Sequence, residues 1–149
     1  CGLPYYVGGE IKSRDKLLVA PIEMLRERHR LDVRIRSEVM SINRNEQTVR
    51  VQNLETGESY EESYDKLIIA TGASPFRPPV PGIDGSRILE LRDLNDADRM
   101  HAYATSGARR AVIVGAGFIG IEVAENLVRR GIHVTIVELS DQILPPWDP

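Results

Sequence analysis

The sequence predicts an α/β fold, in which parallel strands alternate with helices, together with a small antiparallel meander. Residues 111–114 form a β-branched, apolar run that is followed by a glycine-rich turn, a segment with helical periodicity and a second β-branched run at residues 134–137. Residues 67–70 are continuously apolar, which is typical of a strand buried on both faces of a parallel sheet. From Asp32 to residue 58, short runs with a period of two alternate with turn residues, as in antiparallel strands.

The turn at residues 115–120 reads GAGFIG and has the pattern GxGxxG. Gly115 allows a tight turn out of the strand, Gly117 leaves room for a pyrophosphate beside backbone N–H groups, and Gly120 lets the helix lie close to the strand. The helix start and its dipole favour an anion. Glu138 follows the second strand, 18 residues after Gly120, where a carboxylate can accept hydrogen bonds from both ribose hydroxyls of an adenosine. These features predict a dinucleotide-binding βαβ unit rather than a purely structural glycine turn.

The predicted helix after this turn has one apolar face. The residues expected on that face are Gly120, Ala124, Leu127 and Gly131, with Ile121 and Val128 beside them. The residues expected to point elsewhere are Glu122, Glu125, Asn126, Arg129 and Arg130. Glu125 and Arg129 have the spacing of a favourable ion pair, and Gly131 suits the position just past the helix end.

The composition is that of an ordinary globular protein, with 42% hydrophobic and 28% charged residues among 149. The net charge of −3 gives no indication of nucleic-acid binding. No apolar run approaches the roughly 18 residues that a membrane span requires. One cysteine and three scattered histidines predict no metal site and favour the cytoplasm. The chain starts without a methionine and is expected to be a piece of a longer protein.

Two further helices are predicted. Pro21 suits the first turn of a short amphipathic helix over residues 21–30, and a helix over residues 94–106 is expected to have Asp93 or Asn95 near its cap. The first helix begins a basic cluster that could meet phosphates, although a solvated face balanced by Glu23 and Glu27 is the favoured interpretation. The cluster consists of Arg26, Arg28, Arg30, Arg34 and Arg36.

Cys1 begins the stretch CGLPYY. Taken alone, a single cysteine is more often a small buried hydrophobe than a nucleophile. In this chain, however, the cysteine precedes an apolar strand that ends in Ala70, Thr71 and Gly72, and then a GxGxxG turn with its acid. That order resembles the pyridine nucleotide-disulfide oxidoreductases, flavoproteins with two dinucleotide-binding domains. A lone cysteine followed by Gly-Leu-Pro-Tyr is most similar to the coenzyme A-disulfide reductases in the single-cysteine branch.

The resemblance implies that residues 1–106 are part of an FAD-binding domain and that residues 107–149 are the amino-terminal βαβ of a Rossmann NAD(P)H-binding domain. It implies FAD and NADH as cofactors, with NADPH possible, and a homodimeric complete protein. Hydride would pass from the nicotinamide through FAD to a mixed disulfide between Cys1 and coenzyme A, and a cysteine at a helix start would favour the thiolate. This chain holds no second GxGxxG, so by itself it is expected to be inactive.

The implied redox residue is Cys1. The implied cofactor-binding residues are Ala70, Thr71, Gly72, Gly115, Gly117, Phe118, Ile119, Gly120, Glu122 and Glu138. Two other functions stay open. One is an NADH oxidase or peroxidase in which Cys1 cycles through a sulfenic acid. The other is a nucleotide-binding module without redox chemistry.

Overall fold

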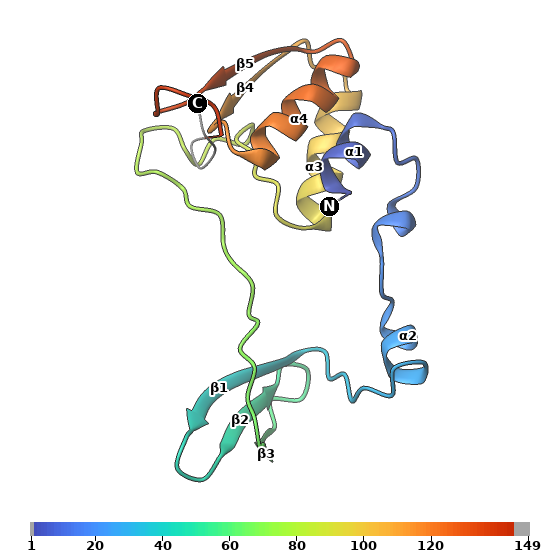
Figure 1. Ribbon diagram of the computed structural model, residues 1–149, viewed down its shortest axis with the longest axis vertical. Helices are drawn as coiled ribbons and strands as arrows, with labels where there is room; N and C mark the ends of the chain where they lie inside the picture. Colours follow the sequence, from blue (N-terminus) through green and yellow to red (C-terminus); the bar gives the residue numbers. More distant parts are fainter. Residues whose placement is uncertain (1, 145–149) are drawn as a thin grey trace. The chain divides into compact units, whose positions relative to one another are not determined.

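The computed structural model describes residues 2–144 and divides the chain into two compact units (Figure 1). One unit combines the amino-terminal residues up to Val19 with the segment that starts at Ser74, and the other comprises residues 20–73. The predicted boundary between residues 106 and 107 concerns the domains of the complete protein and stays a prediction.

The first unit contains the predicted βαβ arrangement. Strands β4 (Arg110–Val114) and β5 (His133–Val137) pair in parallel, with Arg110 opposite His133 and Val114 opposite Val137. Helix α4 (Phe118–Arg129) connects the two strands and covers one face of the pair. From that face, Ala111, Ile113 and Val134 contact the buried core. The other face exposes Val112 and Val114. The mixed α/β class predicted from these runs is therefore confirmed.

Two further helices complete the core of this unit. Helix α1 (Leu3–Gly8) has a proline in its first turn and ends at Gly9, which adopts φ +81°. Helix α3 (Leu94–Thr105) is capped by Asp93, one of the two expected cap residues. Asp93 and Asp96 each accept a hydrogen bond from the other's backbone N–H. Figure 1 shows α1 beside α3 and α4. The buried core comprises Val7, Ala97, Val123, Leu127 and Ile132.

The faces of α4 differ from the prediction at Asn126 and Val128, and Gly131, which follows the helix, is exposed although it was expected on the apolar face. Asn126, expected to point away from the apolar face, is fully buried, whereas Val128, expected beside that face, is 57% exposed. The reason is that α4 packs against α1 as well as against the two strands, so a second side of the helix is covered. The predicted pair of Glu125 and Arg129 is present, with an N–O distance of 2.7 Å.

The second unit contains helix α2 (Ile22–Glu27) and an antiparallel meander of β1 (Ser37–Asn43), β2 (Thr48–Asn53) and β3 (Ser59–Ser63). The meander was predicted from the period of two, although Val33 and Ile35 lie before its first strand. Asn53 accepts backbone hydrogen bonds from Glu55 and Thr56. This local bonding shapes the turn between β2 and β3.

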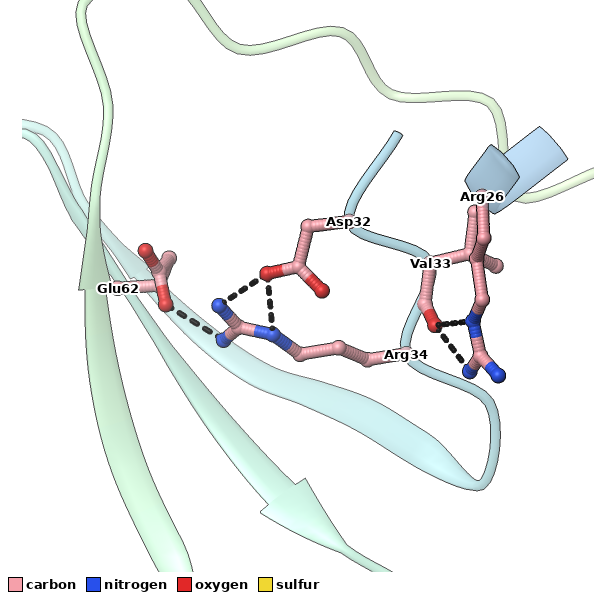
Figure 2. A network of polar contacts seen from close by, with 5 residues as sticks. All are labelled: Arg26, Asp32, Val33, Arg34 and Glu62. Carbon is pink, nitrogen blue, oxygen red and sulfur yellow. Dashed lines mark hydrogen bonds and ion pairs between the residues drawn. The ribbon is translucent and has the colours of Figure 1, made fainter. Parts of the chain in front are cut away.

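Arg34 is the centre of a polar network in this unit (Figure 2). Its guanidinium donates to Asp32 at 2.6 and 2.9 Å and to Glu62 on β3 at 2.5 Å. Arg26 donates to the Val33 carbonyl at 2.7 Å. The hydrogen bonds from Arg34, together with its positive charge, lower the pKa of Asp32. Glu23 and Glu27 were expected to balance this basic cluster, but Asp32 and Glu62 are the partners of Arg34.

Residues 67–70 do not form the predicted buried strand. Ile68 is 88% exposed, and no strand within residues 2–144 pairs with this segment. A strand is held by hydrogen bonds to a neighbour, so an apolar run without one stays extended and solvated. No helix in the described part of the chain is long and apolar enough to cross a membrane.

Candidate nucleotide and redox site

The glycine turn between β4 and α4 has the geometry that the GxGxxG pattern predicts. Gly115 follows β4 with φ +100°, a conformation that side chains disfavour, and its N–H donates to the Val137 carbonyl at 2.8 Å. A Cβ on Gly120 would collide with the Gly115 carbonyl oxygen, whereas a Cβ on Gly117 would meet nothing within 4 Å. Gly120 is therefore needed for packing, and Gly117 opens onto space that a ligand can approach.

Glu138 lies directly after β5 and turns back toward this loop. Its carboxylate accepts hydrogen bonds from the backbone N–H of Ala116 at 2.7 Å and from that of Ser140 at 2.9 Å. The N–H of Ser140, followed by that of Ala116, holds the pKa of Glu138 below its usual range. The turn thus presents a fixed, ionised carboxylate beside Gly117.

Acidification should weaken this contact. A carboxyl group with a depressed folded pKa contributes stability above its unfolded pKa of about 4.3, and that contribution is lost as the pH falls through the lower folded value. We therefore expect Glu138→Gln to flatten the loss of thermal stability below about pH 4.5. Unfolding midpoints from pH 3 to pH 7 measure this, with the exposed neighbour Asp141→Asn as control. Equal acid sensitivity in Glu138→Gln and the wild type would contradict the role of this carboxylate.

Three further predicted cofactor-binding residues lie on the first turns of α4. Phe118 and Ile119 are about half exposed, and Glu122 is partly buried. The structure therefore brings seven of the predicted residues together around one turn. They are Gly115, Gly117, Phe118, Ile119, Gly120, Glu122 and Glu138.

The predicted flavin-side residues belong to the second unit. Ala70, Thr71 and Gly72 are exposed, and Gly72 adopts φ +75°. They stand at the end of the segment that lacks its predicted strand. Cys1 lies outside the described residues, and its role stays a prediction.

Sequence reasoning missed the residues that anchor α1, the helix that follows Cys1. Tyr6 donates its hydroxyl to Asp98 on α3 at 3.1 Å, and its ring stacks on His101 with centroids 4.8 Å apart. The His101 Nδ1 lies 2.9 Å from the Tyr6 carbonyl oxygen. Arg14, in the 3₁₀-helix η1 (Arg14–Leu17), donates to Asp98 at 2.7 Å and lowers the pKa of that carboxyl.

This network binds α1 to α3 through side chains that are far apart in the sequence. Tyr6 and Asp98 are separated by 92 positions. Tyr6 ends the stretch CGLPYY, but nothing in that stretch points to Asp98, so no local pattern could have identified the pair.

Known proteins with similar sequences indicate the family to which this chain belongs. All of residues 1–149 match the sequence profile of the family described as pyridine nucleotide-disulphide oxidoreductase. The chain is 38% identical over 144 residues to coenzyme A disulfide reductase of Staphylococcus haemolyticus, covering 96% of this chain and 32% of that protein. It is 40% identical to NADH oxidase of Enterococcus faecalis, covering 97% and 32%. The chain thus spans about a third of the length of the curated relatives it matches.

Solved structures have the same fold. Reduced Bacillus anthracis CoADR-RHD superposes with a TM-score of 0.88 at 48% identity, covering 99% of this chain and 27% of that one. An NAD-dependent persulfide reductase from A. fulgidus superposes with a TM-score of 0.86 at 36% identity, covering 97% and 27%. Since the family profile covers every residue of this sequence, the chain belongs to the pyridine nucleotide-disulphide oxidoreductase family.

Proposed function

We propose that the complete protein is an FAD-dependent, NADH-linked reductase of a small disulfide, with coenzyme A disulfide or persulfide as acceptor and Cys1 as the redox residue. The observation that carries this proposal is the packing of α1, which starts two residues after Cys1, against α4, the helix that starts at the glycine turn. Helix α1, which follows Cys1 in the sequence, is thereby linked to the nucleotide turn through one packed core. The relatives named coenzyme A disulfide reductase and persulfide reductase support the choice of acceptor.

The residues of the turn fit NADH. The open space beside Gly117 admits a pyrophosphate to the start of α4, and the carboxylate of Glu138 accepts the ribose hydroxyls. Gly115 and Gly120 shape the turn. Phe118, Ile119 and Glu122 follow on α4, where we assign them to the nicotinamide side of the site, with Phe118 controlling access.

The second unit contains fewer residues that could contact FAD than the glycine turn contains for NADH. Ala70, Thr71 and Gly72 are exposed, and the left-handed backbone at Gly72 suits the close approach of a ligand. We assign these residues to the flavin side and assign the main phosphate contacts to a part of the complete protein beyond this chain. When bound, FAD supplies two-electron transfer between the hydride donor and the disulfide.

Cys1 performs the thiol chemistry in this proposal. Its thiolate attacks one sulfur of coenzyme A disulfide, forming a mixed disulfide and releasing one coenzyme A thiolate. Two electrons that originate from NADH then cleave the mixed disulfide, which returns the Cys1 thiolate and releases the second coenzyme A. The overall change converts one NADH, one proton and one disulfide into NAD⁺ and two thiols.

The position of Glu138 predicts the choice of nicotinamide coenzyme. A 2′-phosphate would approach an ionised carboxylate whose two oxygens are already held by the N–H groups of Ala116 and Ser140. We expect the complete protein to prefer NADH over NADPH by at least about tenfold in kcat/KM, because like-charge repulsion of about 1.4 kcal/mol suffices for that ratio. Steady-state kinetics with both coenzymes, repeated with Glu138→Gln, measure it. Equal use of both coenzymes by the wild-type protein would contradict the assignment.

An NADH oxidase or peroxidase is the second candidate, because the chain is 40% identical to NADH oxidase of Enterococcus faecalis. In that case Cys1 would cycle through a sulfenic acid. The test measures NADH oxidation by the FAD-loaded complete protein without oxygen, with coenzyme A disulfide or persulfide, and separately with oxygen or peroxide. The proposed reductase turns over rapidly only with the sulfur acceptors, whereas faster turnover with oxygen or peroxide would establish the alternative.

Other properties of the complete protein also stay proposals. We keep the homodimer and the cytoplasmic location as predictions from the family resemblance. A module that binds nucleotide without redox chemistry would leave NADH unoxidised with every acceptor in the same assay, so the panel separates all three functions.

A further inference from the structure

Asn126 is a buried polar residue that the nucleotide site does not use. It lies on α4 between Val123 and Leu127, two core residues, and its side chain is fully buried. Its Nδ2 donates to the Glu122 carbonyl at 2.8 Å, but its Oδ1 has no hydrogen-bond partner within residues 2–144. A buried acceptor without a partner costs about 1–3 kcal/mol. A leucine of similar size would avoid that cost, so packing alone does not explain the amide.

Asn126 faces the end of α1. A Cβ built on Gly8 would overlap the Asn126 Oδ1 and lie 2.7 Å from its Cγ. The Gly8 hydrogen that a Cβ would replace therefore points at Oδ1, the geometry of a Cα–H···O contact. Such a contact needs no side chain on α1, and it gives the otherwise unpaired oxygen a weak partner.

The next turn of α4 repeats this arrangement. A Cβ on Gly9 would lie 2.7 Å from Nη2 of Arg130, which follows Asn126 by one helical turn. The Nε of Arg130 is buried and, among the described residues, also lacks a hydrogen-bond partner. Gly8 and the following Gly9 thus face two successive turns at the end of α4, and a larger residue at Gly8 would collide with the Asn126 side chain.

We propose that Gly8 and Asn126 form a seat that fixes the position of α1 relative to the nucleotide-binding helix, and that the reactivity of the Cys1 thiol depends on this seat. Asn126 is then a positioning residue for Cys1. The Gly2 carbonyl accepts a hydrogen bond from the Tyr6 N–H at 3.0 Å, so the residue bonded to Cys1 is part of the first turn of α1. Because Cys1 is covalently bonded to Gly2, we expect a shift of α1 on α4 to alter the reactivity of the Cys1 thiol. This inference relies on the proposed function only for the redox role of the thiol.

The test measures the rate at which iodoacetamide alkylates Cys1 in the complete protein, quantified by mass spectrometry of the Cys1 peptide. Gly8→Ala should change this rate by at least about fivefold through altered access or thiolate content. The double variant Gly8→Ala/Asn126→Ala should return the rate to within about twofold of wild type, because the smaller residue at 126 makes room for the methyl group. The Kd for NADH should change less than about twofold in both variants, since neither residue lies at the glycine turn.

Asn126→Leu keeps the test decisive if Gly8→Ala does not fold. It removes the amide at similar volume, so the Tm should not fall, while the alkylation rate of Cys1 should still change by at least about fivefold. The proposal is overturned if Gly8→Ala and Asn126→Leu leave the rate within about twofold of wild type, or if the double variant recovers nothing. Alkylation reports the thiol whatever the electron acceptor is. Failure of the seat is therefore distinguishable from failure of the proposed reductase activity.

Discussion

Cys1→Ser in the complete protein is expected to abolish disulfide reduction while leaving the reduction of bound flavin by NADH within about twofold of wild type. Serine keeps the size of cysteine but cannot supply a thiolate at neutral pH, and the thiolate is the species that attacks a disulfide. Loss of an obligatory nucleophile should lower turnover with coenzyme A disulfide by at least about 10³-fold. Hydride transfer from NADH precedes the thiol step, so it should persist.

Stopped-flow absorbance of the flavin, combined with steady-state turnover, separates the two half-reactions. If Cys1 is only a packing residue, Cys1→Ser should be modestly destabilised, and its activity should follow the amount of folded protein. A serine variant with wild-type disulfide turnover per folded molecule would remove Cys1 from the mechanism. The functional assignment would then be an NADH-linked flavoprotein with a different electron acceptor.

The second large effect is expected at the glycine turn, where two similar substitutions should have different consequences. Gly117 has φ −75° and ψ 178°, which any residue can adopt, and a Cβ there meets no atom within 4 Å. Gly117→Ala should therefore keep the fold but obstruct the approach of the pyrophosphate, weakening NADH binding by about 10²-fold or more. Gly120→Ala places its methyl against the Gly115 carbonyl oxygen. It should cost about 1–3 kcal/mol of stability through overpacking.

Thermal unfolding and NADH titration of both variants in the complete protein check this pair. The expected pattern is an unchanged Tm with weak binding for Gly117→Ala and a lowered Tm for Gly120→Ala. Tight NADH binding by Gly117→Ala would show that this turn does not hold the pyrophosphate. The proposed nucleotide site would then be wrong even if the fold is right.

Local sequence patterns were sufficient to predict those elements whose contacts are between residues close in sequence. The βαβ unit follows from two β-branched runs and a glycine turn, and the start of α3 follows from Asp93, one of the two expected cap residues. The meander was predictable for the same reason, since hairpin strands lie close in sequence.

Interactions between distant segments could not be predicted in this way. Asn126 has the polarity of a surface residue, and only the packing of α1 on α4 buries it. Arg34 selects Glu62, 28 positions away, rather than a glutamate of the adjacent helix. Residues 67–70 have the composition of a buried strand, but composition alone does not supply the neighbour that a strand requires.

Mass spectrometry of Cys1 in the complete, FAD-loaded protein tests the central claim most directly. After exposure to coenzyme A disulfide without oxygen, the Cys1 peptide should carry one coenzyme A in disulfide linkage, and one equivalent of NADH per site should remove it with release of one coenzyme A thiol. An unmodified Cys1 peptide after this exposure, with NADH oxidised only when oxygen or peroxide is admitted, would contradict the proposed disulfide reductase.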